Sequence, residues 1–349
     1  MMLSKKTSKA INTVKIAVLA VAMAFTGAAT ASAGETFDAV KKRGMINCGV
    51  NTSLIGFSSA NSKGEWVGLD VDVCRAMAAA IFGDAKKVKF IPLSGQQRFT
   101  ALQSGEIDVL SRNTTATLSR DTKLGLNFGP VVYYDGAGFL VHNSLGVMDA
   151  KDLEGAAICV QQGTTTELNL ADYFRSNKMS YKAIVIENVE EVSKAFFSGR
   201  CDVLCADQSA LAAERSKAKD PNKYSVLPQV ISKEPLGPAV RHGDDQWLDI
   251  VKWSMVAMVN AEELGIDSKN VDEKAKSSDP RIARLLGGSG ELGDALGVPN
   301  SWAFDIIKQV GNYGESYVRN VGTGSPLGLP RGVNELWTKG GIMYGPPIR

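Results

Sequence analysis

The sequence predicts an α/β fold made of two related units whose strand ends face one another across a cleft. The main observation is a repeat, because SGEIDVLS at 104–111 recurs as SGRCDVLC at 198–205. Short apolar runs alternate with capped segments on both sides of it, as in strands joined by helices. The length of 349 residues, with 44% hydrophobic and 22% charged residues, is enough for two domains with sizeable cores.

The first 33 residues predict a secretory signal peptide. Four lysines precede an apolar segment at 16–26, and Ala31-Ser32-Ala33 is a small-residue cleavage signal before Gly34. The apolar run is too short for a membrane span and no stop-transfer pattern follows it. We therefore expect cleavage after Ala33 and a periplasmic protein.

The first unit alternates strands and helices, with glycines at helix ends. Residues 68–83 open with acidic residues and close on Gly83, which indicates a capped helix with an apolar face. The other expected elements are a helix at 37–43, a strand at 45–50, a turn at 61–64, a strand at 88–93 and a helix at 96–104.

Residues 105–121 carry the chemistry of the first unit. Ile107 to Leu110 is a short apolar run after a Ser-Gly break, which predicts a buried strand. Four polar side chains follow it: Asn113, Thr114, Thr115 and Thr117. Thr117 can cap a helical turn that contains Arg120. Hydroxyls, backbone N–H groups and an arginine at a strand's carboxyl end suit a small carboxylate, although an ordinary loop with a surface arginine is the alternative.

The second unit presents a similar edge. A strand at 156–161 leads into Gly163 and a capping box, Thr164-x-x-Glu167, whose helix would direct free N–H groups at a bound anion. In register with the repeat, Asp207 corresponds to Asn113. The remaining elements are expected at 181–187 (strand), 189–198 (helix) and 201–206 (strand).

The rest of the chain joins or covers the first unit. Segments 130–141 and 226–238 are expected to cross between the units, and 246–263 carries a core-facing helical stripe. A further helix begins at Ser278-Asp279-Pro280, and another covers 302–321 with a break near Gly311. Residues 322–349, rich in glycine and proline, predict an extended strap.

Charge and cysteine usage exclude several classes. The whole chain has a net charge of +2, and the predicted signal peptide contains four lysines and no acidic residue. Residues 34–349 therefore carry a net charge of −2, which gives no reason to expect nucleic acid as a partner. His142 and His242 are isolated and no C-x2-C pair occurs, so we expect no metal and no cofactor.

The five cysteines lie in an exported chain, where disulfides form. Gly44-x-x-x-Cys48 matches Gly155-x-x-x-Cys159, so Cys48 and Cys159 occupy equivalent positions in the first expected strand of the two units. One disulfide per unit is favoured, Cys48–Cys74 and Cys159–Cys201, with Cys205 free. A Cys159–Cys205 bond, or cysteines that are all buried thiols, are the alternatives.

Several motifs in order resemble the periplasmic solute-binding proteins for polar amino acids. They are GLDVDV, RFTALQSGEIDVL, N-x-T-x-T-x-x-R, VQQGTTTE and CDVLCADQ, and the C-terminal KQVGNYGE, RNVG and GGIMYGPPIR resemble the general L-amino-acid-binding branch. The resemblance covers nearly all of the mature chain. It implies a two-lobed clamshell of two doubly wound sheets joined by a hinge (type II-like), serving an ABC importer.

The resemblance also implies roles for individual residues. Arg120 would bind the ligand α-carboxylate, with help from the N–H groups of Thr115 and Thr165. Asp207 would bind the α-ammonium, with Asn113 and the Thr115 hydroxyl as further acceptors. Asp207 as a purely structural strand-end residue is the alternative.

Thr164 is also expected among the ligand-binding residues, and the ligand's side chain is expected near Leu54 and Ala116. Leu54 stands where narrow-specificity members often have an aromatic ring, and Ala116 where related general binders can have a large aromatic residue. Neither selects one side chain, so we expect broad L-amino-acid binding.

The expected organisation is a lobe at 34–135, a second lobe at 136–236, and a third segment, 237–349, that completes the first lobe and adds a helical extension and strap. The expected partners are an L-amino acid and an inner-membrane ABC permease, with the protein a monomer that is not membrane-embedded. A clamshell enzyme, such as a cyclohexadienyl-type dehydratase, and a ligand-sensing module are the alternatives. An enzyme would need an acid or base beyond the ligand clamp.

Overall fold

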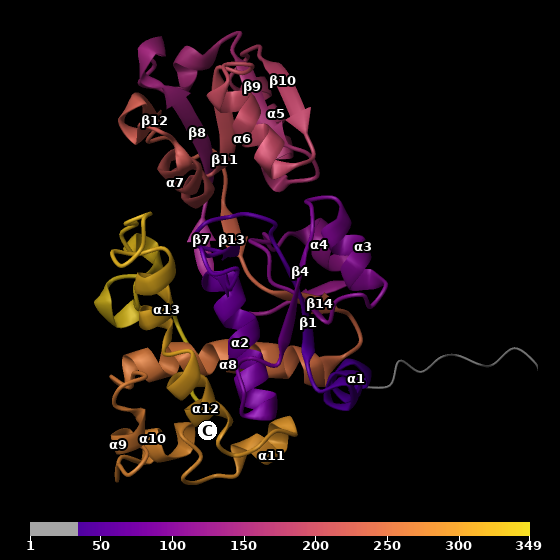
Figure 1. The fold of residues 1–349 in the computed structure, drawn as a ribbon, viewed down its shortest axis with the longest axis vertical. Helices are drawn as coiled ribbons and strands as arrows, with labels where there is room; N and C mark the ends of the chain where they lie inside the picture. Colours follow the sequence, from indigo (N-terminus) through magenta and orange to yellow (C-terminus); the bar gives the residue numbers. More distant parts are fainter. Residues whose placement is uncertain (1–33) are drawn as a thin grey trace, which may run out of the picture.

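The structure is a computed structural model that describes residues 34–349 and consists of two lobes stacked along the long axis (Figure 1). The expected signal peptide and its cleavage site lie outside the described residues. Within the described part, no helix is long and apolar enough to cross a membrane, and no group of His, Cys, Asp and Glu side chains is arranged to hold a metal ion.

Each lobe is built on a five-stranded sheet with one antiparallel strand. The sheet of lobe 1 has the order β4 (Val88–Pro92), β1 (Ile46–Val50), β5 (Val109–Leu110), β14 (Ala239–Arg241) and β6 (Leu126–Phe128). That of lobe 2 has the order β10 (Lys182–Ile186), β9 (Ala157–Gln161), β11 (Val203–Asp207), β8 (Ala137–His142) and β12 (Tyr224–Val226). The two orders correspond strand by strand, which confirms the two related units.

The repeated Asp-Val-Leu motif does the same structural task in both lobes. The Asp108 carboxylate accepts a hydrogen bond from the backbone N–H of Asn47, at the start of β1, at 2.7 Å. The Asp202 carboxylate accepts one from the N–H of Ala157, at the start of β9, at 2.8 Å. Each aspartate thus fixes the register of two neighbouring parallel strands, which explains why the motif recurs.

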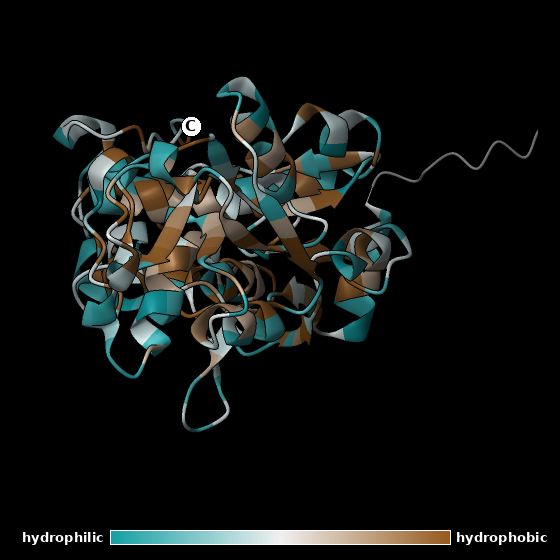
Figure 2. Cartoon of the chain, turned by 90° about the horizontal axis from the view of Figure 1, so that it is seen from above, coloured by the Kyte–Doolittle hydropathy of each residue, from teal (hydrophilic) through white to brown (hydrophobic). Residues whose placement is uncertain are grey.

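Helices cover both faces of each sheet. In lobe 1 these are α1 (Glu35–Arg43), α2 (Leu69–Phe82), α3 (Gln97–Gln103), α4 (Leu118–Thr122) and α8 (Asp245–Glu263). In lobe 2, α5 (Thr165–Ser176) packs on one face, and α6 (Val189–Phe197) and α7 (Gln208–Lys217) pack on the other. Apolar residues concentrate in the central strands and on the inner sides of the helices (Figure 2).

Two short antiparallel strands join the lobes. They are β7 (Tyr133–Asp135) and β13 (Glu234–Leu236), which pair so that Glu234 lies opposite Asp135. They lie in the two segments that were expected to cross between the units. A small hairpin of β2 (Ser59–Ala60) and β3 (Trp66–Val67) frames the predicted turn at 61–64.

The structure contains the disulfides Cys48–Cys74 and Cys159–Cys201. The first joins β1 to α2, and the second joins β9 to the segment before β11. Cys205 is a buried free thiol. Each lobe therefore has its own crosslink, and neither disulfide spans the hinge.

The C-terminal extension packs against lobe 1 and returns to the hinge. Its helices are α9 (Val271–Lys274), α10 (Pro280–Leu285), α11 (Leu292–Leu296), α12 (Trp302–Gln309) and α13 (Tyr313–Asn320). Asp279 caps α10 by accepting from the Arg281 N–H, and Gly311 lies between α12 and α13, as the sequence predicts. The strap then runs beside the hinge, where the Asn334 side chain bonds both backbone groups of Tyr134, at 2.7 and 3.0 Å.

Candidate functional site

A cavity lies between the two lobes, at the carboxyl ends of β1 and β5 on one side and of β9 and β11 on the other. Including its opening to solvent it measures about 660 Å³. Its lining comes from both lobes: Asn51, Leu54, Arg98, Arg112, Asn113, Thr115, Gln161, Thr164, Thr165, Thr166, Val189, Val192, Ser193, Leu204, Cys205, Ala206, Asp207, Ala210 and Glu214.

The lobe 1 loop is held against the hinge as an extra piece of strand. The Ala116 N–H donates to the Pro235 carbonyl at 2.9 Å, and the Gly237 N–H donates to the Thr114 carbonyl at 3.0 Å. In this antiparallel pattern the N–H and C=O of Thr115 point away from β13. The Thr115 carbonyl accepts from Arg120 Nη1 at 2.8 Å, so Arg120 also shapes the loop.

Two predicted helix caps are present, one of them in altered form. The Thr117 hydroxyl accepts from the Arg120 N–H at 3.3 Å, and the Thr164 hydroxyl accepts from the Glu167 N–H at 3.2 Å. The reciprocal half of the capping box was predicted wrongly, because the Glu167 carboxylate accepts from the N–H of Gly163 instead of Thr164. The positive φ of 73° at Gly163 brings that N–H within reach.

The start of α5 faces the cavity through Thr165 and Thr166. N–H groups in the first turn of a helix have no partner within the helix. The positive end of the helix dipole and these donors together favour a negatively charged group.

Asp207 is the acidic end of the site. Its side chain is buried, precedes α7 without capping it, and accepts one hydrogen bond, from the Thr166 hydroxyl at 3.4 Å. Burial raises the pKa of the Asp207 carboxyl well above its ordinary value, and the Asp135 and Glu234 carboxylates raise it further. The Arg98 guanidinium lowers this pKa only in part, so an ammonium group beside Asp207 would further favour the ionised carboxylate.

Three buried arginines form the basic side: Arg98, Arg112 and Arg120. Burial lowers the pKa of Arg112 and of Arg120 to about 10, and lowers that of Arg98 well below its ordinary value. Within the described part of the chain, Nε of Arg98 and Nη2 of Arg112 have no hydrogen-bond acceptor. Both residues line the cavity, so their guanidinium charges favour an anion there.

Glu234, on hinge strand β13, connects the two sides. Its buried carboxylate accepts from the hydroxyls of Thr115 in lobe 1 and Thr165 in lobe 2, at 2.5 and 2.8 Å. It also accepts from Asn169 Nδ2 and Ser232 Oγ, both at 2.7 Å. A carboxyl group thus lies at the meeting point of both lobes and the hinge.

The structure brings six of the predicted site residues to the cavity wall: Leu54, Asn113, Thr115, Thr164, Thr165 and Asp207. Arg120 and Ala116 are not in the lining. The Arg120 guanidinium lies 5.0 Å from the Phe99 ring, and the Arg98 guanidinium lies 4.7 Å from the same ring. Arg98 thus lines the cavity, whereas Arg120 lies behind the lining on the same aromatic ring.

Sequence reasoning missed Arg98 and Glu234. Arg98 was assigned to an ordinary amphipathic helix, and Glu234 lies in a return segment without a motif. A weak signal existed for Arg112, which directly precedes the Asn113 loop.

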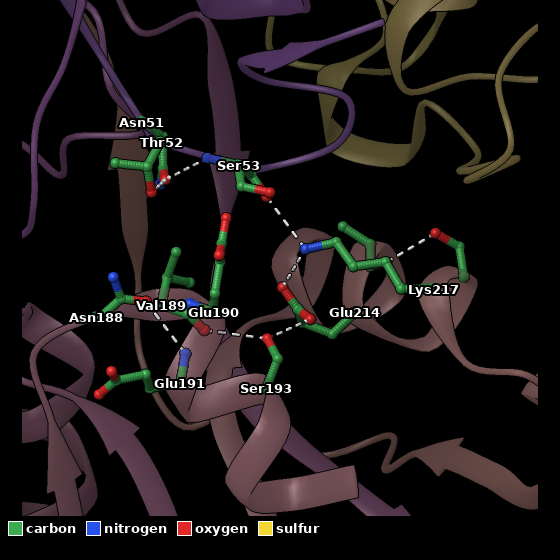
Figure 3. Close-up of polar contacts among 12 residues, drawn as sticks. Asn51, Thr52, Ser53, Asn188, Val189, Glu190, Glu191, Ser193, Glu214 and Lys217 are labelled. Carbon is green, nitrogen blue, oxygen red and sulfur yellow. Dashed lines mark hydrogen bonds and ion pairs between the residues drawn. The ribbon is translucent and has the colours of Figure 1, made fainter. Parts of the chain in front are cut away.

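Glu214, which lines the cavity, forms an ion pair with Lys217 (Figure 3). The buried Glu214 carboxylate accepts from the Ser193 hydroxyl at 2.6 Å and from Lys217 Nζ at 2.8 Å. Lys217 Nζ also donates to the Ser53 carbonyl of lobe 1 at 3.1 Å. This lysine thus ties the two lobes together beside the cavity.

Comparisons with known proteins agree with this geometry. Residues 46–266 match the family described as bacterial extracellular solute-binding proteins, family 3. The general L-amino acid-binding periplasmic protein AapJ of Rhizobium johnstonii is 56% identical over 335 residues, 95% of this chain and 98% of that protein. The glutamate/glutamine/aspartate/asparagine-binding protein BztA of Rhodobacter capsulatus is 51% identical, over 95% of this chain and 97% of its own length.

A solved structure is similar over nearly the whole described chain. An ABC transporter periplasmic binding protein from Brucella ovis, with glutathione bound, has a TM-score of 0.88 and 55% identity, and the match covers 90% of this chain and 99% of that one. The family match ends at Ile266, whereas the relatives at 51–56% identity extend over the helical extension and strap.

Proposed function

Because the chain belongs to family 3 of the bacterial extracellular solute-binding proteins, we propose that it binds the zwitterionic head of L-amino acids between its lobes and delivers them to an ABC importer. The single observation that carries this is the opposition of buried charges across one cavity. Asp207 accepts one long hydrogen bond, from the Thr166 hydroxyl, on one side, and the guanidinium groups of Arg98 and Arg112 lie in the wall of the same cavity. An α-amino acid satisfies both with one molecule.

The α-carboxylate would bind near the start of α5 and the Thr115 loop. Arg120 keeps its proposed role as the main cation for this carboxylate, and Arg98 joins it as a second. The free N–H groups of Thr115 and Thr165 would complete the anion site. Asp207, with Asn113 and the Thr115 hydroxyl, would take the α-ammonium.

Breadth follows from the rest of the lining. Leu54 is aliphatic, and the side-chain space beyond it is walled mainly by Val192, Leu204 and Ala210. Without a clash or an unpaired buried group against particular side chains, discrimination is weak. Aliphatic, polar and charged L-amino acids should bind within about 2–3 kcal/mol of one another, which agrees with the names of the AapJ and BztA relatives.

The matched family and its named relatives are solute-binding transport proteins, which favours binding over the enzyme alternative. The proposed setting is the periplasm, after removal of residues 1–33, with an inner-membrane ABC permease as the partner and the protein as a monomer. The proposed rigid units are 34–135 with 237–349, and 136–236, rotating about β7 and β13.

A titration panel tests the proposal. The purified mature chain should bind most L-amino acids by calorimetry, show a raised melting temperature with each, and release the ligand chemically unchanged. Binding of a single amino acid more than about a thousand-fold tighter than all others would contradict breadth, and recovery of a converted ligand would contradict the transport function.

A second ligand class has one supporting observation. The Brucella relative was solved with glutathione, whose γ-glutamyl residue carries a free α-carboxylate and α-ammonium. The same clamp would hold that head here, and glutathione therefore belongs in the panel. Lack of heat or thermal shift at millimolar glutathione would reject this second class.

A further inference from the structure

One wall of the cavity is a single face of α7. Asp207, at the start of the helix, and Ala210 and Glu214 all line the cavity, and their spacing of three and four residues places them on one side of a helix. At 1.5 Å per residue, the Cα atoms of Asp207 and Glu214 are about 10 Å apart. This separation suits a ligand whose ammonium is at Asp207 and whose long side chain extends toward Glu214.

The wall changes character along its length. Apart from the residues around the zwitterion head, the lining consists of aliphatic side chains followed by Ser193 and Glu214. An aliphatic ligand side chain would end among Val192, Leu204 and Ala210. A longer one would reach the charged pair of Glu214 and Lys217.

The two members of this pair are placed differently. The Glu214 side chain is 5% exposed and lines the cavity, whereas the Lys217 side chain is 26% exposed and lines a groove on the outer side. Ser193 lines both spaces. Lys217 is therefore held at the boundary by two acceptors, the Glu214 carboxylate and the Ser53 carbonyl, on a flexible stem that can move toward either side.

We propose that the Glu214–Lys217 pair binds the charged side chains of both basic and acidic amino-acid ligands. A basic side chain would share the Glu214 carboxylate, while Lys217 keeps the Ser53 carbonyl and water. An acidic side chain would accept from Lys217, while Glu214 keeps the Ser193 hydroxyl. Either sign then finds a partner without leaving a buried charge alone, which is the condition for binding both.

This inference rests on the proposed function and names the residues that extend it to charged amino acids. The test uses calorimetry of L-leucine, L-glutamate and L-arginine with wild type, K217M, E214Q and the double variant E214Q/K217M. K194M is the matched control, because Lys194 is an exposed lysine of the same outer groove. Leucine reports on the head clamp and on closure, and the other two report on the pair.

K217M should lower the affinity for glutamate relative to leucine by about 10- to 100-fold, the worth of a charged hydrogen bond. E214Q should do the same for arginine relative to leucine. The double variant removes both charges without leaving one buried charge alone. It should still bind leucine, but its affinities for glutamate and for arginine should both fall relative to that for leucine. K194M should match wild type.

A parallel loss for all three ligands in K217M would overturn the inference and make Lys217 a closure contact only. Unchanged ratios in the double variant would overturn it as well, because charged side chains would then end elsewhere. If wild type fails to bind leucine, the proposed function itself fails. The further inference fails in a different way: wild type binds all three ligands, and the variants keep the wild-type affinity ratios among leucine, glutamate and arginine.

Discussion

Replacing Asp207 by Asn should weaken ligand binding and stabilise the unliganded protein at the same time. The carboxylate has one long hydrogen bond, at 3.4 Å, and the neighbouring Asp135 and Glu234 carboxylates raise its pKa more than the Arg98 guanidinium lowers it. Its charge is therefore unfavourable until a ligand ammonium arrives. Asn has a similar shape, is a good residue for a helix start, and removes the charge.

The loss of affinity follows from leaving the ligand ammonium without its buried partner. Truncation of one member of a buried charged pair costs about 2–5 kcal/mol, or roughly 30-fold to 5,000-fold in Kd. Calorimetry with an aliphatic amino acid at pH 7.5 measures it.

The gain in stability depends on pH in a defined direction. Because the folded pKa of Asp207 is raised, the folded protein holds its proton after the unfolded chain has lost it. The free energy of unfolding of the wild type therefore falls as pH rises from about 3.9, the pKa of a free aspartate, to the raised folded pKa. The Asn variant lacks this fall in the free energy of unfolding. Its stability should therefore exceed that of the wild type at high pH, and the difference should disappear in acid.

The ligand affinity of the wild type should depend on pH over the same range. An ammonium favours the ionised carboxylate, so wild-type affinity rises with pH through the raised pKa and then levels, and D207N should lose most of this slope. D202N is the control, because Asp202 holds the Ala157 N–H and lies on the same strand segment away from the cavity. It should lower stability and leave affinity unchanged. If D207N kept wild-type affinity, or lost affinity and stability together, Asp207 would be a structural residue and the reasoning would be refuted.

Three further changes test other parts of the site. R120A should keep its circular dichroism spectrum and lose about 30-fold or more in affinity, because a buried ligand carboxylate loses a cation; near wild-type calorimetry would assign the carboxylate to Arg98. E234Q should expand the unliganded protein in X-ray scattering, since its carboxylate accepts from both lobes; an unchanged radius of gyration would contradict that link. N334A should lower unfolding free energy by about 1–3 kcal/mol, as two bonds to the Tyr134 backbone are lost; an unchanged denaturant midpoint would show that the strap does not brace the hinge.

The fold could be predicted largely because its information is local. Glycines end the helices, polar residues start them, and the repeated Asp-Val-Leu motif marks equivalent strands. Gly83 and Gly105, for example, have the positive φ values of 64° and 79° expected after a helix. The same local evidence located the Thr115 loop and Asp207, since both directly follow buried strands.

The missed residues depend on contacts between distant segments. Arg98 lies inside a helix, and its burial results from a second lobe whose Gly163 carbonyl lies 3.4 Å from its guanidinium. Glu234 gains its role only when Thr115 and Thr165, 50 residues apart, meet at the hinge. No periodicity or spacing in the sequence carries such information. The predicted hydrogen bond from the Thr164 N–H to Glu167 was wrong for a local reason, because the turn at Gly163 brings the Gly163 N–H to that carboxylate instead.

The energetics of the lobe boundary explain why binding and closure belong together. Each lobe has its own disulfide, but the largest core cluster runs from lobe 1 through the hinge to Ala210 and Ala213 of α7, so separating the lobes would expose some apolar surface. Among the described residues, polar contacts across the gap away from the hinge include Ser94 with Glu187 at 3.0 Å and Lys217 with the Ser53 carbonyl at 3.1 Å. Partly exposed contacts of this kind contribute about 1 kcal/mol or less each. Under the proposed function, a zwitterion bound by groups of both lobes would favour the closed state by the difference between its contacts in the closed and open states.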